Sequence, residues 1–358
     1  MRIDQVLVGA REGDAITQIA LNLRSVLADF GASDVFARHV DPTVAGIVRS
    51  IDDLEGVSGP DDVVIFQVSI GDDVVWDTVA SLPGRLWVLY QNITPIEFFT
   101  GSPEFARHLE QGRRQLVALR PRVEHVLTAS MFNRSDLATM GFDAVTLIPG
   151  MLEPRRLMGL PSDPAFGREI RSRAPGPIVL FVGQLLPHKR PDVLVSAHHL
   201  LRAHHRPDVT LVLAGHHPSP AYAEQVARFA ESLGLRDSVW ITGGLPDSRL
   251  AELYRRADVV VTASQHEGIC LPVVEAMAMS IPVVVSDHGA LPETVGGCGV
   301  VVRDDAPEGY AEAINLVLDP SRRAAIVGPG RERARVLSLE ASSVAVHRII
   351  ADLLESPA

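Results

Sequence analysis

The sequence predicts an α/β fold built from two doubly wound domains, and three features lead to that prediction. Short runs of β-branched residues alternate with amphipathic helical segments along the chain. The length of 358 residues fits two domains, since domains commonly hold about 100–150 residues each. A stretch rich in proline and glycine, 149–177, separates two sets of strands. This alternation is typical of parallel sheets with helices on both faces.

The N-terminal domain is predicted over residues 1–152. Its first strand is followed by a turn that contains Gly13 and Asp14 and then by a helix over 15–30. Asp14 stands where it can cap this helix or contact a ligand at the strand ends, and both roles stay open. We expect strands over 4–8, 35–37, 61–69, 85–92, 123–129 and 144–148, and further helices over 104–119 and 133–140.

The C-terminal domain is predicted over residues 153–338 and alternates more regularly. Six strands are expected, over 178–182, 209–214, 238–242, 259–263, 282–286 and 299–302. Helices are expected over 271–279, 306–318, 322–336 and 339–354. The segment 149–177 is predicted to connect the two domains as a hinge.

The stretch 257–293 is predicted to form a β-α-β unit with two parallel strands. Ligands bind beyond the carboxyl ends of such strands, and the start of a helix favours anions through its N–H groups and its dipole. Glu267 lies in the loop before the helix, and Glu275 lies about one turn into it. The loop and the helix start contain Ser264, His266, Glu267, Gly268, Ile269, Cys270 and Leu271.

These residues resemble the donor-binding signature of retaining GT-B glycosyltransferases of family 4, Ser-x-x-Glu-Gly-Phe-x-Leu-Pro-x-x-Glu-Ala-Met. Ile269 stands where the family usually has phenylalanine. The resemblance implies two Rossmann-like doubly wound domains that face each other across a cleft. It further implies transfer of a sugar from a nucleoside-diphosphate sugar to a hydroxyl acceptor, with retention of the anomeric configuration. The final helix, about 339–358, is then expected to pack back on the N-terminal domain.

A second motif follows the strand 178–182 and resembles the family pattern Gly-Arg-x-x-x-x-Lys. Lys189 matches the lysine of this pattern, and it is the one lysine among 33 basic residues. Gln184 replaces the expected arginine, which should weaken diphosphate binding unless Arg190 or His188 compensates.

The resemblance assigns roles to these residues. Lys189 and Glu267 are the expected catalytic residues: Lys189 stabilises the leaving diphosphate, and Glu267 orients the sugar. Glu275 is expected to accept hydrogen bonds from the ribose hydroxyls. The remaining expected donor-binding residues are Gln184, Arg190, Gly215, Gly243, Leu245, His266, Gly268, Ile269, Cys270 and Leu271.

The N-terminal domain is expected to contribute residues on the acceptor side of the cleft, namely Gly13, Asp14, Gln91 and Asn92. The stretch after strand 85–92 resembles a Tyr-His-Asn-Ile-Thr-Pro motif found in part of the family. Gln91 replaces the histidine of that motif, and Gln67 likewise stands where relatives often have histidine. Glutamine can hydrogen-bond a sugar hydroxyl but does not titrate near neutral pH.

Composition excludes several other classes. The net charge of −11 argues against a general nucleic-acid binder. No apolar run approaches the ~18 residues of a membrane span, and two cysteines without metal-like spacing suggest a reducing, cytoplasmic location. No metal or other cofactor is expected, because Lys189 and the helix start supply the positive charge. The arginines of helix 104–119 could contact a membrane, but a solvated face is the favoured interpretation.

Two alternative functions are also compatible with the sequence. The glutamines Gln67, Gln91 and Gln184 are compatible with a non-catalytic sugar-nucleotide-binding subunit. A GT-B sugar-nucleotide epimerase would need a titratable acid and base on the N-terminal domain, where the chain has glutamine. Neither the base and sugar of the donor nor the acceptor can be predicted.

Overall fold

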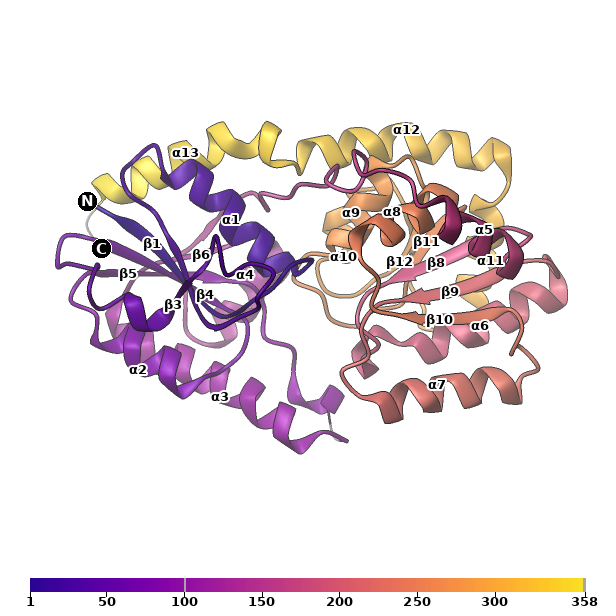
Figure 1. Ribbon diagram of the computed structural model, residues 1–358, viewed down its shortest axis with the longest axis horizontal. Helices are drawn as coiled ribbons and strands as arrows, with labels where there is room; N and C mark the ends of the chain where they lie inside the picture. The colour runs from indigo at the N-terminus through magenta and orange to yellow at the C-terminus, as the bar shows by residue number, and fades with distance from the viewer. Residues whose placement is uncertain (100, 357–358) are drawn as a thin grey trace. The chain divides into compact units, whose positions relative to one another are not determined.

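Two wholly parallel sheets organise the chain in the computed structural model, which describes residues 1–99 and 101–356 (Figure 1). The chain divides into two compact units. The first consists of Met1–Glu153 with the segment from Leu337 onward, and the second of Pro154–Val336. The predicted last helix, 339–358, therefore belongs to the first unit, although its positions 357 and 358 lie outside the described residues.

The described part of the first unit contains a seven-stranded sheet in the order β3-β2-β1-β4-β5-β6-β7. Its inner strands are buried on both faces, which explains why they read as nearly continuous apolar runs. The strands are β1 (Ile3–Ala10), β2 (Val35–Val40), β3 (Arg49–Ser50), β4 (Val63–Val68), β5 (Arg85–Tyr90), β6 (Val123–Thr128) and β7 (Val145–Leu147). The helices are α1 (Ala15–Leu27), α2 (Asp73–Ser81), α3 (Pro103–Leu119), α4 (Met131–Thr139) and α13 (Leu339–Glu355).

Helix α13 packs against α1 in this unit, and both run along the same side of the sheet in Figure 1. The last carbonyls of a helix have no intrahelical donor, and here side chains of the sheet supply donors. The Arg85 guanidinium donates to the Leu353 carbonyl at 3.3 Å, and a ring nitrogen of His125 lies 3.2 Å from the same oxygen. The end of α13 is thereby tied to β5 and β6.

The second unit contains, within its described residues, a six-stranded sheet in the order β10-β9-β8-β11-β12-β13. The chain starts at β8, proceeds to β9 and β10 on one side, and then crosses to β11 on the other side of β8. The strands are β8 (Ile178–Val182), β9 (Thr210–Ala214), β10 (Val239–Gly243), β11 (Val259–Thr262), β12 (Val283–Ser286) and β13 (Val300–Val302). The strand order therefore reverses between β8 and β11. In such a sheet, ligands bind in the crevice at the carboxyl ends of the two strands where the order reverses.

Helices cover both faces of this sheet (Figure 1). Helix α6 packs with α7 and α11, while α9 packs with α10 and α12, and α5 packs with α8. Their bounds are α5 (Pro164–Arg173), α6 (Pro191–His204), α7 (Pro220–Ser232), α8 (Asp247–Arg256), α9 (Leu271–Ala278), α10 (Leu291–Val295), α11 (Pro307–Val317) and α12 (Pro320–Val336).

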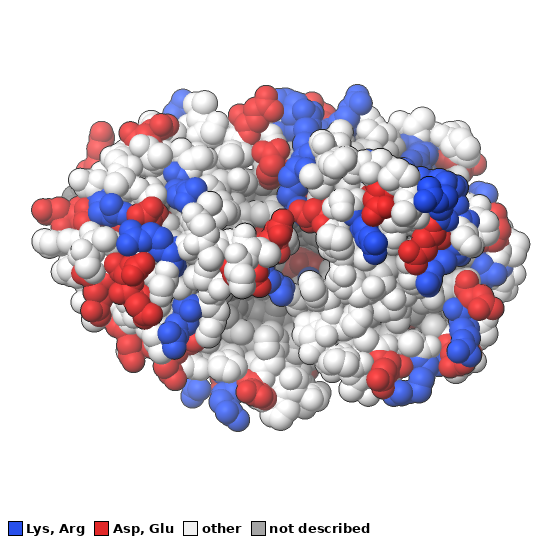
Figure 2. All heavy atoms as spheres, in the orientation of Figure 1, with Lys and Arg blue, Asp and Glu red and all other residues white. Residues whose placement is uncertain are grey.

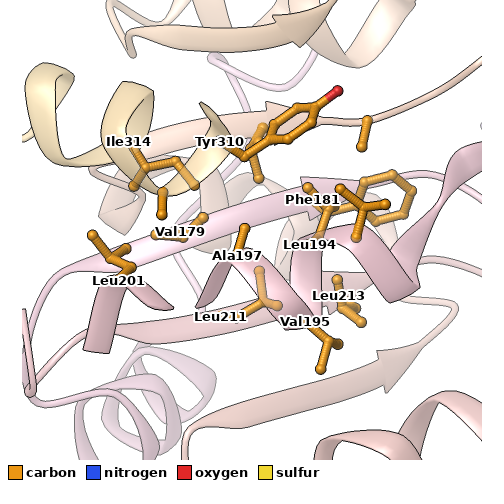
Figure 3. Packing of buried hydrophobic residues seen from close by; sticks show 14 of the residues in the cluster. Val179, Phe181, Leu194, Val195, Ala197, Leu201, Leu211, Leu213, Tyr310 and Ile314 are labelled. Carbon is orange, nitrogen blue, oxygen red and sulfur yellow. The ribbon is translucent and has the colours of Figure 1, made fainter. Parts of the chain in front are cut away.

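The core of the second unit lies between this sheet and the layer of α6 and α11. Figure 3 shows side chains of β8 and β9 meeting those of the two helices. The labelled residues are Val179, Phe181, Leu194, Val195, Ala197, Leu201, Leu211, Leu213, Tyr310 and Ile314. Each buried Val, Leu, Ile or Phe side chain among them contributes about 1.5–3 kcal/mol through removal from water. This packing fixes the strand ends from which the candidate site is built.

The segment predicted as a hinge, 149–177, contains a helix that the sequence analysis did not predict. This helix, α5, is capped by Asp163, whose side chain accepts a hydrogen bond from the Phe166 amide. Asp163 followed by Pro164 is a helix-start signal that the proline content of the segment obscured. The two-residue strand β3 was also not predicted, since it carries no apolar run. In the described part of the chain, no helix is both long and apolar enough to span a bilayer.

Candidate active site

The candidate donor site lies at the reversal of strand order in the second unit. One loop leaves the carboxyl end of β8 and passes through a short 3-10 turn, η4 (Pro187–Lys189), while the other leaves β11 and leads into α9. A backbone hydrogen bond joins the two loops, from the Gln265 amide to the His188 carbonyl at 2.7 Å. Adjacent parallel strands thus bring together two segments that lie about 80 positions apart in the sequence.

Lys189 and Glu267 form an ion pair across these two loops. Their Nζ and Oε1 atoms are 2.5 Å apart, and the side chains are 18% and 11% exposed. The Glu267 backbone is held from the other side as well, because its carbonyl accepts a hydrogen bond from the Ala290 amide at 2.8 Å. The loop that bears Glu267 is therefore fixed at both its edges. A cation and a carboxylate are presented together at the strand ends.

His188 next to this pair is buried, and its charge state follows from that burial. Removal from water lowers the pKa of His188 to about 2, and the positive charge of Lys189 acts in the same direction. The imidazole is consequently neutral at any physiological pH. His188 therefore does not replace the charge that is lost with Gln184, contrary to one of the two compensations considered from the sequence.

Arg190 is the other residue considered as compensation. It adopts a left-handed backbone conformation, with φ of 51°, and begins α6. Its guanidinium pairs with Asp192 at 3.2 Å. Gln184 is half-buried in the same loop. Arg190 thus lies within the predicted site segment, but its charge is already shared with a neighbouring carboxylate.

The start of α9 supplies the backbone part of the site. The first N–H groups of a helix have no acceptor within the helix, and Pro272 in the first turn removes one of them. Cys270 precedes the helix and is buried, and burial raises the pKa of its thiol, so the thiol is protonated and uncharged. Gly268 and Ile269 are half-buried in the loop before it, and Leu271 is the first residue of the helix.

His266 lies in the same loop directly before Glu267 and is mostly buried. Its carbonyl accepts a hydrogen bond from the Ser264 hydroxyl at 3.2 Å, and the Ser264 carbonyl in turn accepts one from the Ser286 hydroxyl at 2.5 Å. These bonds connect the loop to the end of β12. The histidine is thereby positioned by its backbone.

Glu275, the second glutamate of the motif, is almost completely buried, with 2% of its side chain exposed. One carboxylate oxygen accepts from Arg156 Nε at 3.1 Å, and the other accepts from the Tyr254 hydroxyl at 2.9 Å. Burial raises the pKa of Glu275, and the positive charge of Arg156 opposes that shift. The sequence did not predict either partner, because neither lies near Glu275 along the chain and neither belongs to the recognised motif.

The loops after β9 and β10 meet the β8 loop through glycines. The Gly215 amide donates to the Gly243 carbonyl at 3.1 Å. A Cβ atom at Gly215, where φ is +152°, would lie 1.9 Å from the Gly183 carbonyl oxygen. Gly243 has φ of 75°, and Leu245 is half-buried in the loop that follows. The three strand ends are therefore packed backbone to backbone.

In the first unit, Asp14 caps α1. Its carboxylate accepts hydrogen bonds from the amide and the hydroxyl of Thr17, both at 2.9 Å. Gly13 precedes it with φ of 75° and is exposed. The capping role considered from the sequence is present, and contact of Asp14 with a ligand stays a prediction.

Three glutamines form a hydrogen-bonded ladder through the sheet of the first unit. The Gln91 amide nitrogen donates to Gln67 at 2.8 Å, the Gln67 nitrogen donates to Gln5 at 2.7 Å, and the Gln5 nitrogen donates to the Ala20 carbonyl at 2.9 Å. Gln5 and Gln67 are buried, so this ladder satisfies polar groups that would otherwise be costly. It gives the two glutamines that replace histidines a structural role.

Asn92 follows Gln91 with a positive φ of 88°. Its side-chain nitrogen donates to Asn133 Oδ1 at 2.8 Å. Asparagine tolerates the left-handed region better than most residues, which suits this tight turn at the end of β5. Side-chain hydrogen bonds therefore hold Gln91 and Asn92 at the carboxyl edge of the first sheet.

Figure 2 shows both acidic and basic side chains on the drawn face of each unit, with uncharged residues between them. On α3, Arg113 is engaged with Asp136 at 2.6 Å and is therefore not part of a free basic surface. The solvated interpretation of this helix stays a prediction. Within residues 1–99 and 101–356, no three His, Cys, Asp or Glu side chains are grouped as metal ligands; a metal-free mechanism is likewise still a prediction.

Comparison with known proteins adds to this geometry. The family model described as Glycosyl transferases group 1 matches residues 165–333. The D-inositol 3-phosphate glycosyltransferase of Acidothermus cellulolyticus is 35% identical over 196 residues, which make up 52% of this chain and 41% of that protein. The chain thus spans less than half the length of this curated relative.

Solved structures match over nearly the whole chain. Sucrose-phosphate synthase from Thermosynechococcus elongatus gives a TM-score of 0.77 at 20% identity, covering 98% of both chains. Anabaena Alr3699/HepE, solved in complex with UDP-glucose, gives a TM-score of 0.77 at 19% identity, covering 99% of both chains. The comparisons support the group 1 glycosyltransferase family through residues 165–333, and the fold of the chain is that of the GT-B glycosyltransferases.

Proposed function

We propose that the protein is a retaining glycosyltransferase that moves a sugar from a nucleoside-diphosphate sugar to a hydroxyl acceptor. The observation that carries this proposal is the Lys189–Glu267 pair, with 2.5 Å between its charged atoms, beside the start of α9. This arrangement lies where the strand order of the second sheet reverses, which is the usual ligand crevice of such sheets. The matched family and the UDP-glucose complex of Alr3699/HepE are consistent with it.

The chemistry follows from the charges that develop. Breaking the bond between sugar and phosphate leaves negative charge on the diphosphate and positive character on the anomeric carbon. Lys189 and the amides from Ile269 to Leu271 would stabilise the diphosphate. Glu267 would hold the sugar hydroxyls and ease the cationic centre. Preorganised groups of this kind contribute about 3 kcal/mol each to transition-state stabilisation.

Glu275 would receive the ribose. Among the described residues, each of its carboxylate oxygens has one hydrogen-bond partner, and a carboxylate oxygen can accept two hydrogen bonds. One acceptor position therefore remains on each oxygen for the two ribose hydroxyls. The backbone around Gly215, Gly243 and Leu245 would surround the base. Gly13, Asp14, Gln91 and Asn92 are proposed as residues on the acceptor side.

The proposal is tested by following donor cleavage with NMR. The protein is incubated with UDP-, GDP-, ADP- and dTDP-sugars and a set of hydroxyl acceptors. We expect one donor class to be consumed in the presence of acceptor and the product to keep the anomeric configuration of the donor. Inversion would refute the retaining mechanism. Isomerisation of the donor without acceptor would favour the epimerase, and binding without any turnover would favour the non-catalytic subunit.

A further inference from the structure

Arg156 joins two parts of the candidate nucleoside site. It lies near the start of the second unit, in a segment that precedes α5. Its Nε atom lies 3.1 Å from Glu275 Oε1 on α9, and its Nη1 atom pairs with Asp247 on α8. The Arg156 side chain is 17% exposed, so most of this guanidinium is removed from water. An arginine in this environment is held by its acidic partners rather than by solvent.

The burial of Glu275 makes a cationic partner necessary. An ionised carboxylate in an apolar setting is costly unless it is paired and hydrogen-bonded. Tyr254 donates one hydrogen bond at 2.9 Å but carries no charge, and burial further raises the pKa of its own hydroxyl. Arg156 is thus the charged partner of Glu275, and together with Tyr254 it orients the carboxylate through one hydrogen bond to each oxygen.

Asp247, the second partner of Arg156, connects the guanidinium to the loop proposed to surround the nucleobase. Asp247 is the first residue of α8 and directly follows the loop 243–246. The guanidinium is planar and presents its donors in a fixed fork, so one side chain can hold two carboxylates at a defined separation. Arg156 consequently couples the position of this loop to the orientation of Glu275.

We propose that Arg156 is a positioning residue for nucleoside recognition: through Glu275 it orients the acceptor of the ribose hydroxyls, and through Asp247 it anchors the loop beside the base. This inference rests on the proposed function, because it assumes that the second unit binds a nucleoside diphosphate. The proposal assigns Arg156 no contact with the diphosphate. Its loss should therefore affect the nucleoside part of the ligand and spare the diphosphate part.

The test compares two probes on the same variants by isothermal titration calorimetry. The first probe is the nucleoside diphosphate that wild type binds most tightly, and the second is inorganic pyrophosphate. We expect Arg156→Ala to weaken the nucleoside diphosphate at least about tenfold, the equivalent of one charge-assisted hydrogen bond, and to change pyrophosphate affinity less than about twofold. Arg156→Lys should recover part of the loss, and added guanidinium ion should recover part of it in Arg156→Ala.

Arg249→Ala is the matched control. Arg249 lies on α8, the helix that begins with the Arg156 partner Asp247, but it pairs with Asp163 at 3.3 Å and its side chain is 47% exposed, so we expect unchanged affinity for both probes. Thermal melts of each variant report whether it is folded. If Arg156→Ala is unfolded, the two probes are compared on Arg156→Lys instead. Unchanged nucleoside affinity, or an equal loss for both probes, would overturn the inference. A wild-type protein that binds none of the nucleoside diphosphates would overturn the proposed function itself, and with it this inference.

Discussion

Because Lys189 and Glu267 form an ion pair, we expect replacement of one or the other to have opposite effects on the affinity for a diphosphate. Lys189→Met removes the cation that the proposal assigns to the diphosphate, and affinity for a nucleoside diphosphate should fall about 10- to 100-fold, as expected for a lost charge-assisted hydrogen bond. Glu267→Gln removes a carboxylate that competes with the diphosphate for Lys189. Pyrophosphate should then bind several-fold more tightly, whereas sugar transfer should fall by at least about 100-fold.

The structure also sets the expected cost in stability. Two unit charges about 4 Å apart interact by about 4 kcal/mol at the effective dielectric constant of a protein surface. Since the two side chains are only 18% and 11% exposed, desolvation offsets much of this attraction. We expect the free energy of unfolding to fall by about 2–3 kcal/mol in each single variant. A double-mutant cycle should give a coupling free energy of about 1–3 kcal/mol between the two side chains.

Urea unfolding of wild type, Lys189→Met, Glu267→Gln and the double variant measures this coupling, and calorimetry with pyrophosphate measures the binding effect. The exposed pair of Arg236 and Glu231, at 3.0 Å, is the matched control in the same unit. Arg236→Met should change stability by less than about 0.5 kcal/mol, as is usual for surface pairs. Equal losses of pyrophosphate affinity in both single variants would show that Glu267 does not compete with the diphosphate for the lysine.

Three further predictions concern other parts of the second unit and its ligand. Gly215→Ala places a Cβ atom 1.9 Å from the Gly183 carbonyl oxygen, so we expect a loss of about 2–4 kcal/mol in urea unfolding; an unchanged midpoint would contradict the close packing. Burial lowers the pKa of His198 to about 3, below its pKa of about 6.5 in the unfolded chain. The contribution of the neutral buried histidine to the free energy of unfolding is therefore complete above about pH 6.5 and is lost as the pH falls. His198→Gln should therefore reduce the decrease in stability between pH 8 and pH 5 by about 2 kcal/mol, and an identical pH profile in both proteins would argue against a neutral buried histidine. Removal of divalent ions with EDTA should leave donor cleavage unchanged, and a loss that Mg²⁺ restores would disprove the metal-free mechanism.

The sheets were predictable because their strands carry a simple signal. Strands β8, β11 and β12 are buried on both faces, and each reads as a short run of β-branched and other apolar residues bounded by turns. The joining of Lys189 to Glu267 follows from that topology, since the two loops leave adjacent parallel strands. Here a local pattern and a general rule of parallel sheets were sufficient.

Other features depend on packing that no local pattern encodes. The pairing of Arg156 with Glu275 joins residues 119 positions apart. The glutamine ladder joins β1, β4 and the end of β5 through side-chain amides. In both cases polar groups are buried and must find partners, but the sequence does not say which partner each one finds. The neutral state of His188 has the same origin, because burial is its main cause and the charge of the adjacent Lys189 only adds to it.

A calorimetric titration of the wild-type protein with UDP, GDP, ADP, dTDP and CMP tests whether the second unit binds a nucleotide-sugar donor. Binding of one nucleoside diphosphate at a ratio of one to one, displaced by its nucleotide sugar and weakened by Lys189→Met, is the predicted result. Failure of all five nucleotides to bind would contradict the assignment of the Lys189–Glu267 site to a nucleotide-sugar donor.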